Sequence, residues 1–143
     1  MSFDFKVKDG DLAIGPDGDL LQVRDTEKLI QDILKMVTTQ LGSNVFYPWY
    51  GSSVSKSLVG SVFDMEFVSS IAIGQLSNSI ETLQRLQQSQ AQKQSVTPGE
   101  LLAAIERISI ERNQVDPRFF RIVIKVITRA LTSVQTEFEL NSL

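Results

Sequence analysis

Hydrophobic and polar positions alternate in short runs at the start of the chain, over residues 3–23. Two turn sequences interrupt the alternation, Asp9-Gly10 and Gly15-Pro16-Asp17-Gly18. Glycine supplies the positive φ that many turns need, and proline fixes φ at about −65°. The pattern predicts a β-hairpin or meander that occupies residues 1–25.

The spacing of apolar residues then changes to three and four, which is typical of a helix with one buried face. Asp25 or Thr26 is a suitable N-cap for this first helix, and Gly42 is a suitable end. Its predicted buried face comprises Leu29, Ile30, Ile33, Leu34, Val37 and Leu41. A second, long amphipathic helix is predicted from about Asp64 to Leu86, and the glutamine-rich residues 87–94 are interpreted as its frayed end and a linker.

A third, short helix is predicted at Thr97-Pro98-Gly99-Glu100. This sequence places threonine at the N-cap, proline at the first helical position and glutamate where a capping box needs it. The helix is expected to end near Ile105. Residues 26–105 are therefore predicted to be a helical part with two main helices plus this short third one.

Alternation of apolar and polar residues returns after the short helix, at residues 108–111, 120–127 and 132–140. A period of two is typical of half-buried strands, and the connections at residues 113–118 and 129–131 are short enough to favour antiparallel pairing. The type of the second turn stays open, because it lacks glycine and asparagine. We therefore predict one α+β domain over residues 1–143, which ends in an antiparallel sheet of about three strands within residues 106–143.

Composition narrows the classes of function. The 143 residues are 42% hydrophobic and 22% charged, as in an ordinary globular protein, and the net charge of −3 argues against a nucleic-acid partner. The N-terminus lacks the basic and apolar regions of a secretory signal, and no apolar run approaches the roughly 20 residues that span a bilayer. The expected protein is soluble, with proteins as its partners.

The sequence contains neither histidine nor cysteine, which excludes Ser-His-Asp and Cys-His arrangements and leaves a carboxylate pair as the enzymatic option. Glu27, Asp32, Asp64 and Glu66 are acids of this kind, but each is expected at a helix start or on a polar helix face. The repeats Asp9-Gly10-Asp11 and Asp17-Gly18-Asp19 suit turns, because a calcium loop that began at Asp17 would place Lys28 at the glutamate position. We expect no enzyme activity, cofactor or metal.

Three segments together carry a resemblance to a known family. They are Asp17-Gly18-Asp19-Leu20 leading to Val23; Leu29-Ile30-Gln31-Asp32-Ile33; and Gln40-Leu41-Gly42 followed by Pro48-Trp49-Tyr50-Gly51-Ser52. The chain resembles the baseplate-wedge, sheath-initiator proteins of contractile phage tails, which have relatives in type VI secretion baseplates. The resemblance implies a structural subunit of the tail baseplate, present in about six copies, which docks on wedge proteins and templates the first ring of tail sheath.

The same resemblance implies a location in the virion, assembly in the host cytoplasm, and tail tube or hub proteins as further partners. Members of the family carry a Glu-Pro-Arg docking motif before the terminal strands. Here the match by position is Glu106-Arg107-Ile108, which lacks the proline, and the match by spelling is Asp116-Pro117-Arg118, which comes one strand later. We favour the match by position.

Two further surfaces are predicted from the resemblance and the pattern. The terminal strand is expected to pair with a sheath strand through Thr132, Ser133, Val134, Gln135, Thr136, Glu137, Phe138, Glu139 and Leu140. The aromatic loop Tyr47-Pro48-Trp49-Tyr50-Gly51 either closes the domain's own core or anchors a partner, and we favour self-packing with partial exposure.

Two functions of other classes stay as alternatives. One is a carboxylate-dependent glycosidase of the cell wall, because some members of the family have carried a lysozyme label, which the lack of a convincing acid pair leads us to set aside. The other is a free adaptor or assembly module.

Overall fold

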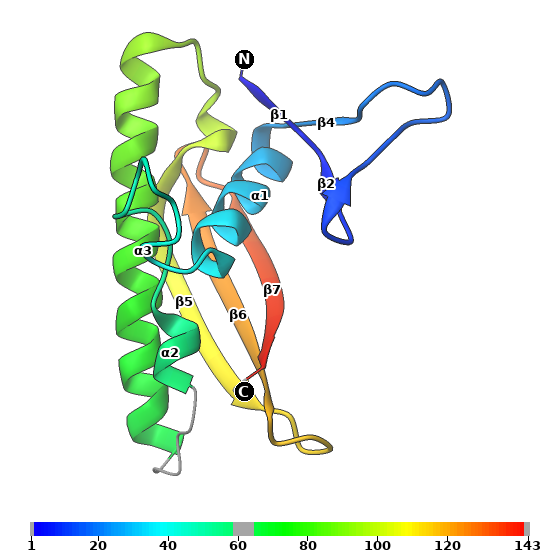
Figure 1. Cartoon of the computed structure of the whole chain (residues 1–143). Coiled ribbons are helices and arrows are strands. Elements are labelled where there is room, and N and C mark those ends of the chain that lie inside the picture. The colour runs from blue at the N-terminus through cyan, green and yellow to red at the C-terminus, as the bar shows by residue number, and fades with distance from the viewer. Residues whose placement is uncertain (1, 59–64, 142–143) are drawn as a thin grey trace.

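The computed structural model describes residues 2–58 and 65–141. It is an α+β fold, as predicted, with strand pairs at the N-terminus and a three-stranded antiparallel sheet at the C-terminus (Figure 1). The elements in chain order are β1 (Phe3–Phe5), β2 (Val7–Lys8), β3 (Asp11–Leu12), β4 (Gln22–Arg24), α1 (Asp25–Thr38), α2 (Val54–Leu58), α3 (Met65–Lys93), the 3-10 helix η1 (Pro98–Glu100), β5 (Leu102–Arg112), β6 (Phe119–Thr128) and β7 (Ser133–Asn141).

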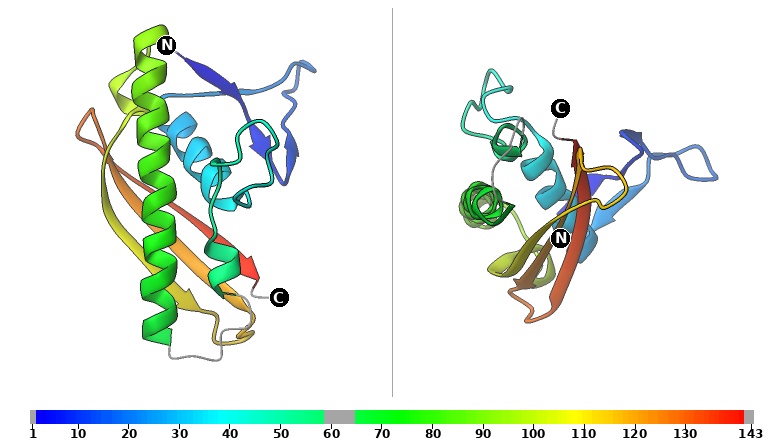
Figure 2. Two further views of the ribbon diagram at one scale, coloured as in Figure 1. Left: turned by 60° about the vertical axis from the view of Figure 1, so that its left-hand side comes forward. Right: turned by 90° about the horizontal axis from the view of Figure 1, so that it is seen from below.

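The core lies between one face of the sheet and helices α1 and α3 (Figure 2). Strand β6 is central in the order β5-β6-β7. Its period of two buries Phe120, Ile122, Ile124 and Val126, while Arg121 on the opposite face is exposed. Each fully buried side chain of this size contributes about 1.5–3 kcal/mol. The alternation in the sequence therefore identified the buried face of the sheet correctly.

Helix α1 ends at Thr38 and not at Gly42, so the predicted end was wrong. The chain leaves the helix because Gln40 forms a parallel bridge with Ser52, which closes the intervening residues into a loop. Leu41, predicted on the buried face, is consequently 42% exposed. At the other end, the N-cap residue is Arg24, which makes no side-chain cap bond, so neither Asp25 nor Thr26 has the predicted role.

The glutamine-rich segment is helical and not a frayed linker, because α3 continues to Lys93. Gln87 is buried: its Nε2 donates to the Glu100 carbonyl (2.9 Å), and its Oε1 accepts from the Leu102 N–H (2.8 Å). These bonds fix the start of β5. Residue Asp64, where the helix was predicted to begin, lies outside the described residues.

The predicted short helix to Ile105 was also wrong, because η1 covers only Pro98–Glu100 and β5 already begins at Leu102. Thr97 makes no side-chain cap bond; its hydroxyl donates to Asp25 (2.7 Å) and Glu100 (3.0 Å). Gly99 is required there, because a Cβ at this position would lie 2.3 Å from an Asp25 carboxylate oxygen. The helical part therefore ends before Leu102, and the strand part begins earlier than residue 106.

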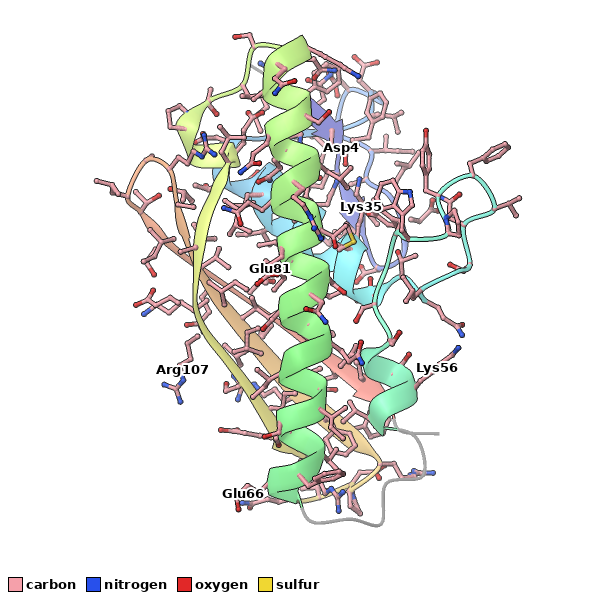
Figure 3. The ribbon with its side chains drawn as sticks, turned by 90° about the vertical axis from the view of Figure 1, so that its left-hand side faces the viewer. Asp4, Lys35, Lys56, Glu66, Glu81 and Arg107 are labelled. Atoms are coloured by element: carbon pink, nitrogen blue, oxygen red, sulfur yellow. The ribbon has the colours of Figure 1, made fainter. Side chains whose placement is uncertain are left out.

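The N-terminal residues form an arm that projects beside α1 (Figure 1). Strands β1 and β4 pair antiparallel, and β2 pairs with β3, which confirms the predicted hairpin or meander. Gln31 of α1 holds the arm in place: its Oε1 accepts from Val7 N–H (2.9 Å) and its Nε2 donates to the Phe5 carbonyl (2.8 Å). An ion pair between Asp4 and Lys35 adds to the attachment, and the two side chains face each other in Figure 3.

Candidate functional site

The residues predicted to act in assembly fall in three places. Glu106 and Arg107 lie in β5, and the predicted sheath-pairing residues form β7 with Thr132 just before it. Asp116, Pro117 and Arg118 lie in the turn that joins β5 to β6. The structure brings Glu106 and β7 together, since the Ser133 hydroxyl donates to Glu106 (2.9 Å).

The turn before β7 determines which backbone groups of the strand face outward. Thr128 N–H donates to the Thr132 carbonyl (2.9 Å), and Leu131 N–H donates to the Thr128 carbonyl (2.9 Å). Leu131 has φ of 62°, so this is a type I turn closed by a residue in the left-handed region. Thr128 and Thr132 thus form a hydrogen-bonded pair from which the ladder starts.

Hydrogen-bonded and non-hydrogen-bonded pairs alternate along an antiparallel ladder. Pairing of β7 with β6 runs without a register shift from Ser133 to Asn141. The backbone groups of Val134, Thr136, Phe138 and Leu140 therefore face β6, and those of Ser133, Gln135, Glu137 and Glu139 face the outer edge. Within the residues that the structure describes, no hydrogen bond engages these outward groups.

The side chains of β7 alternate between two faces. Thr136 is buried, while Val134, Phe138 and Leu140 pack against the core from partly buried positions. The side chains of Gln135, Glu137 and Glu139 are exposed on the other face. Strand β7 is thus attached to the core by the side chains of its buried face. Its outer backbone edge presents amides and carbonyls that are not hydrogen-bonded to any described residue.

Strand β5 contains a β-bulge at the predicted docking residues. Ile105 pairs with Val126 and Arg107 pairs with Lys125, which leaves Glu106 as the extra residue. A hollow of about 520 Å³ on the exposed face of the sheet is lined by Glu106, Arg107, Ser109, Val123, Lys125 and Gln135. Arg107 points outward past β5, away from α3 (Figure 3).

Arg118, the alternative docking arginine, already forms an ion pair with Asp116. Its Nε and Nη2 donate to the two carboxylate oxygens of Asp116 at 3.0 and 2.9 Å. Hydrogen bonds from Arg118 lower the pKa of Asp116. The two residues and Pro117 form a self-contained turn at the tip of the β5–β6 connection.

The aromatic loop is closed at its base and open at its tip. Gly51, with φ of 118°, approaches α1 so closely that a Cβ would lie 2.6 Å from the Thr39 carbonyl. Tyr50 packs against the core, whereas Tyr47 and Trp49 stack edge to face and are about half exposed. Pro48 is exposed as well. The loop therefore divides between the two predicted roles, with Tyr50 on the domain's own core and Tyr47 and Trp49 available at the surface.

The acids that the sequence singled out, as far as the structure describes them, do not form a shared site. Asp32 lies 2.7 Å from Lys28 in an ion pair within α1, and burial raises the pKa of Asp32. Glu27 and Glu66 are exposed on different helices, and Asp64 lies outside the described residues. Across residues 2–58 and 65–141, no group of three or more acids is placed to hold a metal ion.

Two groupings of residues were not recognised in the sequence. One is the bulge, which depends on a register that no local pattern records. The other is Glu100, which is 2% exposed and accepts hydrogen bonds from Ser2 and from Thr97, the residue that also reaches Asp25. A buried carboxylate of this kind ties the N-terminus to the start of β5.

Among the described helices, none is long and apolar enough to cross a membrane.

Comparison with known proteins adds one finding about the fold. The sequence matches no protein-family model and no curated protein. The structure is similar to that of a presumed tail lysozyme from Geobacter sulfurreducens, with a TM-score of 0.51 at 15% identity. The match covers 80% of this chain and 88% of that one. At this identity the likeness shows a shared fold.

Proposed function

We propose that this chain is a structural subunit of a contractile phage tail baseplate that provides a template strand for the first ring of tail sheath. The observation that carries the proposal is the free outer edge of β7, nine residues long, with its row of unengaged amides and carbonyls. Monomeric proteins usually cover or interrupt such an edge, whereas an assembly protein uses it to add a strand. The name of the similar Geobacter sulfurreducens protein, a tail lysozyme, supports a place in a tail.

Docking on baseplate wedge proteins is assigned to Glu106 and Arg107. Arg118 is engaged by Asp116, whereas Arg107 has no ion pair among the described residues. An arginine that is free in the isolated chain is the better candidate for a partner's surface. This difference supports the match by position over the match by spelling.

A ring of about six copies accounts for the stability of such an assembly. Each added backbone hydrogen bond contributes about 1 kcal/mol net, so one short strand pairing is weak. Several copies held together raise the effective concentration of every further contact. The proposed setting is the tail baseplate of the virion, assembled in the host cytoplasm, with sheath and wedge proteins as direct partners and tube or hub proteins as neighbours.

The glycosidase alternative receives less support from the geometry. Inverting and retaining glycosidases need two carboxyl groups about 5–9.5 Å apart across an open sugar cleft. Two acids that the fold brings together, Asp25 and Glu100, share the Thr97 hydroxyl, but Glu100 is buried and bonded within the fold. We therefore propose a non-enzymatic role.

Proline substitutions on β7 test the proposal. Gln135→Pro or Glu137→Pro removes only an outward N–H, so the chain's own ladder stays intact. We expect folded variants that enter baseplates but fail to nucleate sheath, visible by electron microscopy as tubes without ordered sheath. Gln135→Ala and Glu137→Ala, which keep the amide, should support normal sheath.

Thr136→Pro is the matched control for folding, because its N–H faces β6 and its loss should disturb the sheet itself, measured by circular dichroism. Ordered sheath on baseplates that carry a folded Gln135→Pro or Glu137→Pro variant would contradict the proposal. The edge of β7 would then be part of the scaffold and sheath initiation would lie elsewhere.

A further inference from the structure

The bulge in β5 places two cations opposite each other on the exposed face of the sheet. Arg107 and Lys125 are direct cross-strand partners. Like charges at directly opposite positions destabilise a sheet. We call the three residues Glu106, Arg107 and Lys125 the bulge site.

The carboxylate within the bulge site does not neutralise Arg107. Glu106 Oε1 lies 3.7 Å from Lys125 Nζ, and its Oε2 accepts the Ser133 hydroxyl of β7 (2.9 Å). Glu106 therefore leans across β6 toward β7, away from the outer side of β5. In the described part of the chain no carboxylate pairs with Arg107, although Arg121 pairs with Glu137 on the same face at 2.5 Å.

We propose that the bulge site binds an aspartate or glutamate side chain of a partner protein, with Arg107 as the principal ligand and Lys125 as the second. This inference rests on the proposed docking role and specifies its chemistry. A guanidinium offers two parallel N–H donors that match a carboxylate, and Lys125 adds a point charge. A bound carboxylate offsets the repulsion between Arg107 and Lys125. The partner therefore supplies the negative charge that the described part of the isolated chain does not place beside Arg107.

The rest of the exposed face favours a single carboxylate over a polyanion. Further along the sheet, Glu111, Glu137 and Glu139 line a neighbouring hollow together with Arg112 and Arg121. A nucleic acid would bring successive phosphates against these acids, and nucleic-acid affinity depends on clustered cations. The partner surface is therefore an acidic side chain at the bulge site with basic or neutral groups beside it, which face the acids of the neighbouring hollow.

The isolated chain gives the first measurement. Removal of one cation by Arg107→Gln should raise the melting temperature slightly, because the cross-strand repulsion disappears. Arg118→Gln, which removes a paired arginine, should leave the melting temperature unchanged or lower it. A lower melting temperature for Arg107→Gln would show that Arg107 is a structural residue and would overturn the proposal.

Incorporation into baseplates gives the second measurement. Arg107→Gln should reduce the amount of chain in purified baseplates roughly tenfold, because a charged hydrogen bond to the partner is lost, and Lys125→Gln should reduce it less. Arg118→Gln should incorporate normally. Normal incorporation of Arg107→Gln would overturn the proposal, as would binding of a single-stranded oligonucleotide that is lost in this variant.

These outcomes separate the inference from the proposed function. If Arg107→Gln enters baseplates normally while Gln135→Pro still blocks sheath, the bulge site does not bind a partner carboxylate and the proposed templating role stands. If the wild-type chain is absent from purified tails, the templating role itself fails.

Discussion

A glutamine side chain takes the place of a strand at the edge of the N-terminal arm. Gln31 bonds the backbone of Phe5 and Val7, two residues apart, as a neighbouring strand would, and its Nε2 also donates to Asp4 (3.0 Å). Asp4 in turn pairs with Lys35 one turn further along α1. Gln31, Asp4 and Lys35 are thus polar residues that hold the N-terminal arm against α1.

The attachment of the arm should depend on pH through Asp4. Burial alone would raise the pKa of Asp4, but hydrogen bonds from Lys35 and Gln31 outweigh burial and hold that pKa below its usual value. A depressed carboxyl pKa adds stability that is present above the unfolded value of about 3.9 and is lost as pH falls through the folded value. The raised pKa of Asp32 acts in the opposite sense, so its contribution falls as pH rises.

We therefore expect the free energy of unfolding of the wild type to fall more on acidification than that of Asp4→Asn. The gap between the two proteins should be constant above about pH 5 and should narrow below about pH 4. Chemical denaturation at a series of pH values measures this difference. Parallel curves for the two proteins across the whole range would show that Asp4 does not contribute.

The C-terminal strands show where sequence patterns succeed, and the helix ends show where they fail. The alternation over Phe120 to Val126 predicted β6 correctly, because one buried face imposes a period of two. Local patterns failed where a distant bond decides the structure: the bridge from Gln40 to Ser52 ends α1, and Gln87 fixes the start of β5. The bulge at Glu106 depends on the register of β5 against β6, which the sequence does not record, so the pairing of Arg107 with Lys125 was not predicted.

Gln87 provides a direct test at the level of elements. Gln87→Leu leaves the Leu102 N–H and the Glu100 carbonyl without partners in a buried position, at a cost of about 1–3 kcal/mol for each unpaired group. Urea denaturation should show this loss. Gln88→Leu, at an exposed position of the same helix, should change stability by no more than about 0.5 kcal/mol. A loss of stability for Gln87→Leu as small as that for Gln88→Leu would mean that the hydrogen bonds between α3 and β5 do not stabilise the fold.

The whole molecule presents different chemistry at the two edges of its sheet. The start of β5 is covered by α3, since Gln87 bonds Leu102 N–H and Gln84 Nε2 donates to the Ala103 carbonyl (3.1 Å). The bulge interrupts β5 further along. Strand β7, on the opposite edge, has free backbone groups over its outer side. The proposed docking surface lies on the exposed face of the sheet and reaches Gln135 of β7, whereas the proposed templating surface is the outer backbone edge of β7.

The isolated chain should be folded and mostly monomeric, with weak association that depends on concentration. The edge of β7 is the surface available for this association, and Gln135→Pro should reduce it. Light scattering or sedimentation across a range of concentrations measures the effect. A stable, closed hexamer of the isolated chain would contradict the expectation, because the ring would then form without the baseplate.

The unequal edges also limit how copies of this chain can stick together when no partner is present. Fibres grow when one surface of a subunit fits a different surface of the next, so that every addition leaves a new site open. Here a β7 edge meets a covered, interrupted β5 edge, and such head-to-tail stacking is disfavoured. Two β7 edges can pair with each other by two-fold symmetry, and that contact uses up both free edges at once. Because side chains of α3 cover the start of β5, the expected product of self-association at high concentration is a finite dimer and not an open-ended fibril.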